Sequence, residues 1–436
     1  MLNVRKRIAI IGTGIAGNGA AWALRRGSDH DITVFEAAET AGGHSATVDV
    51  DYDGRRISVD TGFIVYNEVN YPNLTRLFAQ LGVETQESDM SFSVSGVDGA
   101  IAWTSRPADF FGGRMPVQLH IPSPVHLRVL DDLVRFNRSG VADLHAGRLA
   151  GLTLGEYLDR GRFSRLFRDD YLLAMGSAIW SMPSGGVLAF PAEAFLRFFE
   201  NHRLLRISRP VWRTVTGGSR AYVARLTATY SDSLRLATRV VSVRPTAEGP
   251  VVTLASGERE AFDAVLLACH SDQAVDMLDG ADERQTRLLS SIRYRDNIAY
   301  LHRDPALMPG RPSGWAAWNV LKRPDGDVSV SYWMNALQGL DPSCPLFVTL
   351  NPVKPPREDL TFGRYEYAHP QFDREALDAQ AGLSVLQGLG GVWFCGAWTG
   401  YGFHEDGLLS GLLVAESLGA RLPWTPTPRL LLQAAE

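Results

Sequence analysis

Short apolar runs that alternate with helical segments organise this chain. The first run, Arg7 to Ile11 (RIAII), is typical of a buried strand and leads into a segment rich in glycine and alanine that predicts a helix. A second run, 32–35 (ITVF), predicts a neighbouring strand, and similar runs recur at 263–269 and 392–395. Strands that alternate with helices in this way predict an α/β fold with a parallel sheet.

The turn between the first strand and the first helix carries three glycines at the spacing GxGxxG (GTGIAG, 12–17). Glycines at these positions permit a tight turn, a close backbone approach to a pyrophosphate and close packing of helix on strand. An acidic residue about 20 positions further on can accept hydrogen bonds from ribose hydroxyls, and Glu36 ends the second strand. The sequence therefore predicts a dinucleotide site made by these residues: Gly12, Gly14, Ile15, Ala16, Gly17 and Glu36.

Two long segments, 91–210 and 291–384, carry no nucleotide signature and are expected to build a substrate domain. The first contains an arginine-dense helical stretch, 126–172, in which apolar residues recur at helical spacing. This stretch is either the solvated face of an ordinary helical layer or a surface that docks on anionic phospholipid headgroups. Its arginines are Arg128, Arg135, Arg138, Arg148, Arg160, Arg162, Arg165 and Arg168.

The rest of the two segments predicts an apolar interior with a few polar groups. Residues 171–205, rich in Leu, Phe, Met and Trp, predict the core of the first segment or the wall of a long apolar tunnel. Residues 313–320 and 328–335 alternate like two strands joined by a turn. Asn319 and Asn335 in these strands are candidates for polar groups in an aromatic-lined cavity, and equally for structural amides.

A predicted strand that ends at Pro370 carries candidates for proton transfer. Tyr367 and His369 alternate onto one face of this strand, and Pro370 disfavours helix at the preceding residue. Imidazole and phenol groups can act as general acids or bases. We expect these two residues either to handle a proton or to form a structural pair.

Composition narrows the function classes. The chain has 436 residues, of which 45% are hydrophobic and 21% charged, and a net charge of −5, which argues against a nucleic-acid partner. Its three cysteines form no CxxC pair, as expected in a reducing cytosol, and no metal site is predicted. No signal peptide and no apolar run of about 20 residues is visible, so we expect a cytoplasmic protein. The tail from Pro423 onward is expected to be loosely attached.

Further glycine motifs indicate a family resemblance. A glycine pair followed by histidine, 42–44 (GGH), lies just beyond Glu36, and a predicted strand, 59–63, ends in Gly62 and Phe63. Near the other end of the chain, 392–400 (VWFCGAWTG) is followed by 404–411 (HEDGLLSG). Together these motifs resemble those of the flavin amine oxidase and phytoene desaturase superfamily.

This resemblance implies non-covalently bound FAD and a discontinuous, Rossmann-like FAD-binding domain of the amine oxidase type. Its segments would be 1–90, 211–290 and 385–422, and the α+β substrate domain would comprise 91–210 and 291–384. In the superfamily the second glycine pair passes close to the FAD phosphates, and a helix N-terminus closes over the flavin O2 atom. The further FAD contacts that the resemblance implies are Gly42, Gly43, His44, Gly62, Phe63, Val240, Gly396, Gly407, Leu408 and Leu409.

The sequence departs from true amine oxidases at two features. Those enzymes commonly use a lysine that reaches flavin N5 through water, whereas Lys6, Lys322 and Lys354 here fall before the first strand, in a turn and in a proline-rich loop. They also carry a tyrosine cage for the amine. Just ahead of Gly407 this chain has 403–406 (FHED), although Tyr401 leaves a shifted register open. A hydrocarbon therefore fits the pattern better than an ammonium group.

A narrower resemblance points to a substrate class. The segments 59–81, 88–94 and 394–411 are similar to those of bacterial FAD proteins often associated with cyclopropane-synthase-type methyltransferases. One branch of these proteins resembles the desaturase of furan fatty acid biosynthesis. The resemblance implies dehydrogenation of a methylated, unsaturated fatty acyl chain, carried in phospholipid, to a conjugated diene.

This reaction needs a group that accepts a proton, and His369, Tyr367 and His404 are the candidates. His404 alternatively only shapes the flavin-binding turn. A flavin-dependent double-bond isomerase and an oxidase of an amine or another small apolar substrate remain alternatives. The partners expected are the acyl or phospholipid substrate and an anionic membrane at the inner face of the cell, and the oligomeric state, a homodimer included, stays open.

Overall fold

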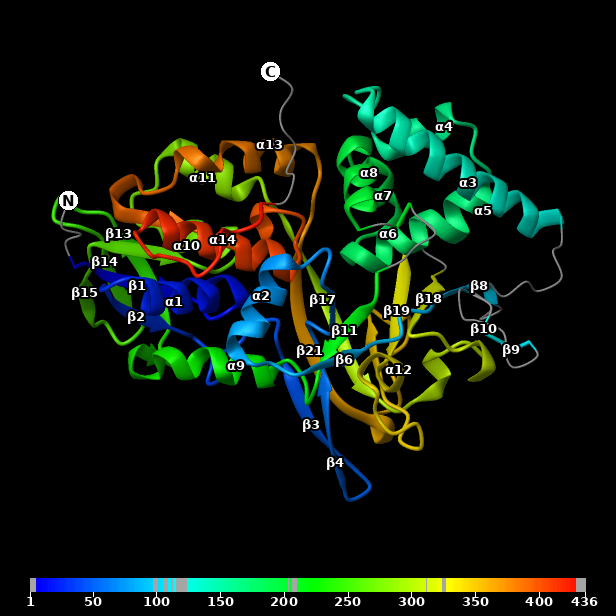
Figure 1. Cartoon of the computed structure of the whole chain (residues 1–436), viewed down its shortest axis with the longest axis horizontal. Coiled ribbons are helices and arrows are strands. Elements are labelled where there is room, and N and C mark those ends of the chain that lie inside the picture. Colours follow the sequence, from blue (N-terminus) through cyan, green and yellow to red (C-terminus); the bar gives the residue numbers. More distant parts are fainter. Residues whose placement is uncertain are drawn as a thin grey trace.

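The computed structural model shows a mixed α/β protein, as the sequence predicts. A parallel sheet with its helices lies beside a larger mixed sheet, and a layer of helices covers the latter (Figure 1). Within the described ranges no helix is long and apolar enough to cross a membrane. These ranges are 5–96, 101–104, 109–110, 113–114, 124–202, 204–205, 210–310, 312–323 and 327–428.

Five parallel strands form the first sheet, in the order β12-β2-β1-β16-β22. Helices α1 (Ile15–Gly27) and α14 (His404–Ser417) pack against each other on the face of this sheet that carries Ile8 and Ile10. These strands come from the three segments expected to bind the dinucleotide. Their bounds are Arg7–Ile11 (β1), Asp31–Phe35 (β2), Leu234–Arg235 (β12), Ala264–Leu267 (β16) and Val392–Phe394 (β22).

The opposite face of the parallel sheet, which carries Ala9 and Ile11, is also covered. An antiparallel sheet in the order β13-β14-β15 and three helices pack on it, so the strands are buried on both sides. The covering elements are β13 (Val240–Arg244), β14 (Val251–Leu254), β15 (Arg259–Ala261), α10 (Ser271–Met277), α11 (Glu283–Ser290) and α13 (Arg374–Gly382).

The second large sheet has seven strands in the order β21-β17-β20-β19-β18-β7-β8. Neighbouring strands are antiparallel except for β18 and β7, and β18 and β19 form the hairpin predicted from the sequence. The bounds are Phe92–Ser95 (β7), Ile101–Thr104 (β8), Tyr294–His302 (β17), Trp318–Lys322 (β18), Val328–Trp333 (β19), Phe347–Leu350 (β20) and Thr361–Pro370 (β21).

The helical layer forms from the arginine-dense segment and the aromatic segment that follows it. Its core is aromatic, with Phe136, Phe167, Trp180, Phe195 and Phe198 almost fully buried. Residues 171–205 thus form a core, which is one of the two alternatives that the sequence leaves open. The helices are α3 (Pro124–His145), α4 (Leu154–Arg160), α5 (Arg165–Phe167), a π-helix (Arg168–Leu172), α6 (Leu173–Trp180), α7 (Ser184–Ala189) and α8 (Ala192–Asn201).

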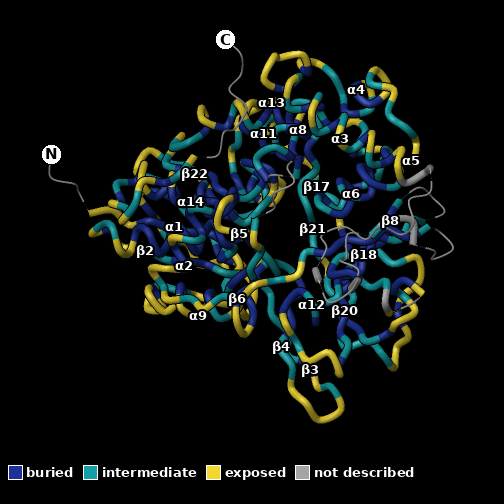
Figure 2. Tube along the Cα trace, turned by 45° about the vertical axis from the view of Figure 1, so that its right-hand side comes forward, coloured by how far each residue is buried: buried dark blue, intermediate teal, exposed yellow. Residues whose placement is uncertain are grey.

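Smaller elements connect the two large sheets. The hairpin of β3 (Thr47–Tyr52) and β4 (Arg55–Asp60) projects from the body of the molecule, with exposed residues at its tip (Figure 2). Next to its base lie a three-stranded sheet and three short helices. These are β5 (Val65–Asn67), β6 (Thr85–Glu87), β11 (Trp212–Val215), α2 (Pro72–Leu81), α9 (Arg220–Thr227) and α12 (Met334–Gln338).

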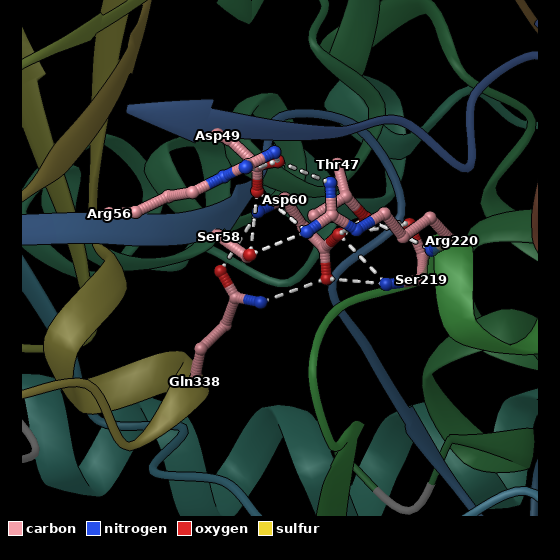
Figure 3. Close-up of polar contacts among 8 residues, drawn as sticks. All are labelled: Thr47, Asp49, Arg56, Ser58, Asp60, Ser219, Arg220 and Gln338. Carbon is pink, nitrogen blue, oxygen red and sulfur yellow. Dashed lines mark hydrogen bonds and ion pairs between the residues drawn. The ribbon is translucent and has the colours of Figure 1, made fainter. Parts of the chain in front are cut away.

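The carboxylate of Asp60, at the end of β4, joins three of these parts (Figure 3). It accepts hydrogen bonds from the Thr47 hydroxyl (2.5 Å), from the Ser219 amide and hydroxyl (both 2.9 Å) and from the Gln338 side chain (2.9 Å). Burial raises the pKa of Asp60 to about 6, although these donors act in the opposite direction. The Arg220 guanidinium next to it binds Asp49 through two hydrogen bonds.

The tail from Pro423 is attached more firmly than the sequence predicts. The Trp424 ring lies 5.5 Å from the Trp22 ring, and its indole N–H donates to Asn73 in α2. The Thr427 amide donates to the same Asn73 oxygen at 2.9 Å. The expectation of a loose end was therefore wrong up to residue 428, because the Trp424 ring and the Thr427 amide anchor the tail. The last eight residues lie outside the described ranges.

We predict that Asp60→Asn lowers the free energy of unfolding by about 3 kcal/mol. The substitution replaces one carboxylate oxygen by an NH₂ group, which cannot accept a hydrogen bond, so some of the buried donors around Asp60 lose their acceptor. Urea denaturation followed by circular dichroism measures this change. Asp53→Asn is the matched control, because Asp53 is exposed in the β3–β4 turn and has a positive φ that Asn tolerates. A loss of stability no larger for Asp60→Asn than for Asp53→Asn would contradict the role given to Asp60.

Candidate active site

The turn after β1 uses each of its three glycines differently. Gly12 has φ +101°, and a Cβ atom there would lie 2.8 Å from the carbonyl oxygen of Ala268. A Cβ atom on Gly17 would lie 2.0 Å from the Gly12 carbonyl oxygen, so this glycine lets α1 approach β1. A Cβ atom on Gly14 would have no described protein atom within 4 Å, because Gly14 borders a cavity. The first amides of α1 have no partner within the helix, so this open space suits an anionic group such as a pyrophosphate.

Glu36 is held at the rim of the same space. Its Oε2 atom accepts hydrogen bonds from the Thr13 amide (2.9 Å) and the Thr13 hydroxyl (2.5 Å), and its Oε1 atom accepts one from the Ala38 amide. These contacts orient the carboxylate, and Oε1, which accepts one hydrogen bond, keeps capacity for a further donor. Glu36 therefore fits the role of an acceptor for ribose hydroxyls.

One cavity of about 1190 Å³ connects the glycine turn with the second sheet. It exceeds the volume of about 300–1,000 Å³ that is usual for one small ligand, so it can hold a dinucleotide together with a substrate. The residues that line its nucleotide side include Gly12, Gly14, Ile15, Ala16, Glu36, Gly43, His44, Thr238, Val240 and Gly396. The apolar side is lined by Met90, Phe92, Met175, Ala178, Ile179, Phe198, Trp318, Tyr332 and Leu350.

Charged groups are scarce in the lining. Within the described ranges, the charged residues are Glu36, Asp89, Arg239 and Asp276, and no lysine is present. Asp89 is exposed, and its Oδ1 atom accepts from the Ser91 amide. Lys322 pairs with Asp170 in the helical layer. This arrangement agrees with the expectation that none of the lysines lies where it could reach the flavin.

Three histidines cluster in the wall of the cavity. The ring of His44 lies 5.9 Å from that of His270 and 5.6 Å from that of His369. Burial lowers the pKa of His44 to about 4 and that of His369 to about 3, and neighbouring histidines add to both shifts. All three rings are therefore neutral near pH 7.

Two asparagines determine which nitrogen of His369 carries the proton. The Ile298 amide donates to Asn351 Oδ1 (3.0 Å), so Asn351 Nδ2 donates to Asn297 Oδ1 (2.7 Å). Asn297 Nδ2 then donates to His369 Nδ1 at 2.9 Å. Because Nδ1 accepts, the neutral ring carries its hydrogen on Nε2 and acts there as a donor.

His44 lacks such a relay. Its Nε2 atom is buried with no hydrogen-bond partner among the described residues. In the neutral ring that carries its hydrogen on Nδ1, this nitrogen is an acceptor. An unpaired buried acceptor in a cavity wall indicates a missing donor, either a ligand group or a water.

The other two predicted catalytic residues also line the cavity. The Tyr367 hydroxyl lies 2.7 Å from the Thr61 hydroxyl, and burial raises its pKa. His404 stacks on Phe63 with ring centroids 3.8 Å apart, and its Nε2 atom is hydrogen-bonded to Ser45 and Tyr222. Because its Nε2 atom is already engaged, His404 fits the positioning role better than the proton-transfer role.

Five predicted cofactor residues do not line the cavity but support its wall. A Cβ atom on Gly42 would lie 2.8 Å from the Ser45 carbonyl, and one on Gly407 would lie 2.8 Å from Ile15. The remaining three are buried between α1, α14 and β1. The five residues are Gly17, Gly42, Gly407, Leu408 and Leu409.

Polar residues next to these motifs are structural. Asn319 and Asn335 bond to neighbouring backbone and side-chain groups and do not line the cavity, so the structural alternative fits both. Glu405 accepts hydrogen bonds from the Asn73 and Leu74 amides and so caps α2. Tyr401 packs on Phe198 and is outside the cavity lining, so it does not supply the cage tyrosine that a shifted register left open.

Sequence reasoning missed His270, Asn297 and Asn351. His270 follows the strand β16, and its position beyond the carboxyl end of a parallel strand was an available signal. The two asparagines gave no signal, because Asn297 reaches His369 only through the pairing of β17 with β21, and Asn351 reaches Asn297 only through the pairing of β17 with β20.

Comparison with known proteins agrees with this geometry. The family model for flavin containing amine oxidoreductases matches residues 15–297. The chain therefore belongs to this family and is a flavin-dependent oxidoreductase. A search of the curated proteins gave no match.

Several solved structures share the fold. Wild-type putrescine oxidase bound to putrescine has a TM-score of 0.70 at 16% identity, covering 96% of this chain and 100% of that chain. The CLA-producing fatty acid isomerase from P. acnes has a TM-score of 0.67 at 16% identity, covering 95% and 99%. Cyclohexylamine oxidase from Brevibacterium oxydans has a TM-score of 0.64 at 16% identity, covering 95% and 98%. At these identities the likeness shows the fold alone.

We predict that Gly14→Leu abolishes flavin retention while the protein stays folded, because its side chain would enter open cavity rather than protein. Visible absorbance of the purified variant measures flavin, and circular dichroism measures folding. Gly17→Leu is the comparison variant and should fail to fold, since its side chain would meet the Gly12 backbone. Full flavin occupancy in Gly14→Leu would show that the site is misplaced.

Proposed function

We propose that the protein uses FAD to dehydrogenate a methylated, unsaturated fatty acyl chain, carried in phospholipid, to a conjugated diene. The observation that carries this proposal is the apolar side of the cavity, which is continuous with the dinucleotide side. A long hydrocarbon chain fits such walls because each buried methylene is stabilised by about 0.8 kcal/mol.

The cofactor proposed is FAD, held without a covalent bond. The open space at Gly14, the oriented carboxylate of Glu36 and the backbone near Val240 fit the pyrophosphate, ribose and adenine of a dinucleotide. Cys269 lines the cavity, but burial raises the pKa of its thiol to about 12, so it is a poor nucleophile for attachment. Cys395 is fully buried in the core.

An amine substrate fits this cavity less well. A cationic amine is stabilised in a binding site by a paired carboxylate, and amine oxidases add a cage tyrosine. Asp89 is exposed and already bonded to the Ser91 amide, and Tyr401 packs away from the lining. Three neutral histidines add no negative charge that would attract a cation.

The chain's own residues can handle the proton that dehydrogenation releases. When bound, oxidised flavin supplies the acceptor for the hydride that leaves the activated allylic carbon. His44 keeps an unpaired Nε2 acceptor in the cavity wall, so we assign the proton to that atom. His369 presents an N–H group, which suits it to orient the reacting groups by donating a hydrogen bond. The apolar walls exclude water from the reacting carbon.

A second candidate function is double-bond isomerisation of a fatty acid. The fatty acid isomerase from P. acnes shares the fold over 95% of this chain. The same apolar cavity would hold the chain, and net electron transfer would be absent. The reaction test below separates the two candidates.

We predict that anaerobic mixing with phospholipid carrying a methylated monounsaturated chain bleaches the flavin as a conjugated diene forms. Stopped-flow absorbance follows the flavin, and ultraviolet absorbance follows the diene. Putrescine and cyclohexylamine should leave the flavin oxidised. Bleaching by the amines alone would refute the acyl proposal, and a shifted double bond without bleaching would establish the isomerase instead.

We predict that His44→Leu slows this flavin reduction by about 10²-fold, and His369→Leu by a smaller factor, with flavin retained in both. An acceptor must be unprotonated, and burial lowers the pKa of His44 to about 4. The wild-type rate should therefore stay constant between about pH 5.5 and 8 and fall only at lower pH. A larger loss in His369→Leu, or an inflection near the ordinary histidine pKa of about 6.5, would contradict this assignment.

A further inference from the structure

The outer face of α3 exposes two apolar residues on one stripe that also carries an arginine. Residues 127, 131, 134 and 138 recur at helical spacing and are all exposed. Leu127 is 53% exposed and Val134 is 66% exposed; Asp131 lies between them and Arg138 ends the stripe. Two apolar side chains beside arginines suit an interfacial surface, where the former enter an apolar layer and the latter bind anions.

A second exposed segment, 160–166, is tied firmly to α3. The Arg135 guanidinium donates to the Gly161 carbonyl at 2.5 Å and lies over the Phe163 ring. The buried carboxylate of Asp132 accepts from the Ser164 amide at 2.9 Å. These contacts place Leu166, which is 37% exposed, on the segment anchored to α3.

The arginines of this region fall into two groups. Arg128, Arg135, Arg148 and Arg168 each form an ion pair with an aspartate. The second group has no ion pair among the described residues and is exposed: Arg138, Arg160, Arg162 and Arg165. Four exposed acids lie in the same stretch: Asp131, Glu156, Asp159 and Asp169. Asp159 and Asp169 both lie next to Arg168, and Glu156 is engaged in the capping box of α4. The eight arginines exceed the exposed acids and the aspartates paired to them, so the surface keeps a net positive charge.

The helical stretch that carries Leu166 continues into the cavity wall. Leu166 belongs to α5, which runs through the π-helix into α6. Tyr171, Met175 and Ile179 on this continuous helical stretch line the cavity. Leu166 and Tyr171 are five residues apart, which is about 8 Å at 1.5 Å per residue.

We propose that an anionic phospholipid bilayer docks on this surface, which consists of Leu127, Val134, Arg138, Arg160, Arg162, Arg165 and Leu166. The unpaired arginines bind lipid phosphates, and the apolar side chains enter the boundary between headgroups and acyl chains. The purpose of this docking surface rests on the proposed function, since it would place the cavity beside its lipid substrate. The contact itself does not depend on the reaction.

Co-sedimentation with vesicles tests the docking surface. The flavin-loaded protein should bind vesicles of phosphatidylglycerol and phosphatidylcholine and should bind pure phosphatidylcholine vesicles at least tenfold more weakly. Salt of about 1 M, where the Debye length is about 3 Å, should release it. Changing Arg138, Arg160, Arg162 and Arg165 together to Gln should weaken binding at least tenfold, and Val134→Asp should weaken it further.

The matched control changes four exposed arginines elsewhere to Gln: Arg26, Arg259, Arg284 and Arg287. Flavin content should be unchanged in both sets. Equal binding to neutral and anionic vesicles, or an equal loss in the control set, would overturn the proposal. Dimerisation that the docking-surface variants abolish, without vesicle binding, would overturn it in favour of self-association. Because sedimentation needs no turnover, its result is independent of whether the diene forms.

Discussion

The buried carboxylate of Asp60 is the interaction on which the arrangement of this molecule depends. It receives donors from β3, from the turn before α9 and from α12, three parts that are far apart in the sequence. A buried charge without such donors would be strongly unfavourable, so these parts can meet only in one geometry. The same turn has Gly218 at a positive φ, where a Cβ atom would meet Thr47. One polar contact thus holds the nucleotide side of the cavity against the seven-stranded sheet.

Local chemistry explains what the sequence could predict. The roles of Gly12, Gly14 and Gly17 follow from neighbouring residues, so the strand, turn and helix were predictable, and so was the pair of Tyr367 and His369 on one strand. The hydrogen-bond partner of His369 was not, because Asn297 in β17 and His369 in β21 lie 72 residues apart in the chain. Which arginines are ion-paired likewise depends on how helices pack.

The cavity shows how a polar cluster can remain uncharged. Burial and mutual repulsion keep the histidine rings neutral, and the asparagine relay gives His369 a donor where His44 has an acceptor. Such a pair can direct a proton without a fixed charge, because donor and acceptor are set by tautomers rather than by ionisation. A neutral histidine cluster of this kind is compatible with a hydrocarbon substrate, because it adds no charge to the wall beside the apolar side of the cavity.

The π-helix Arg168–Leu172 has a geometric consequence for the cavity. An α-helix turns by about 100° per residue, and a π turn accommodates an additional residue before the α-helix resumes. The π-helix therefore sets the rotational phase of α6, and with it the stripe of Tyr171, Met175 and Ile179 that faces the cavity. Removal of one residue from this turn would rotate that stripe toward the helical core. The orientation of these cavity-lining side chains thus depends on the number of residues in one helical turn.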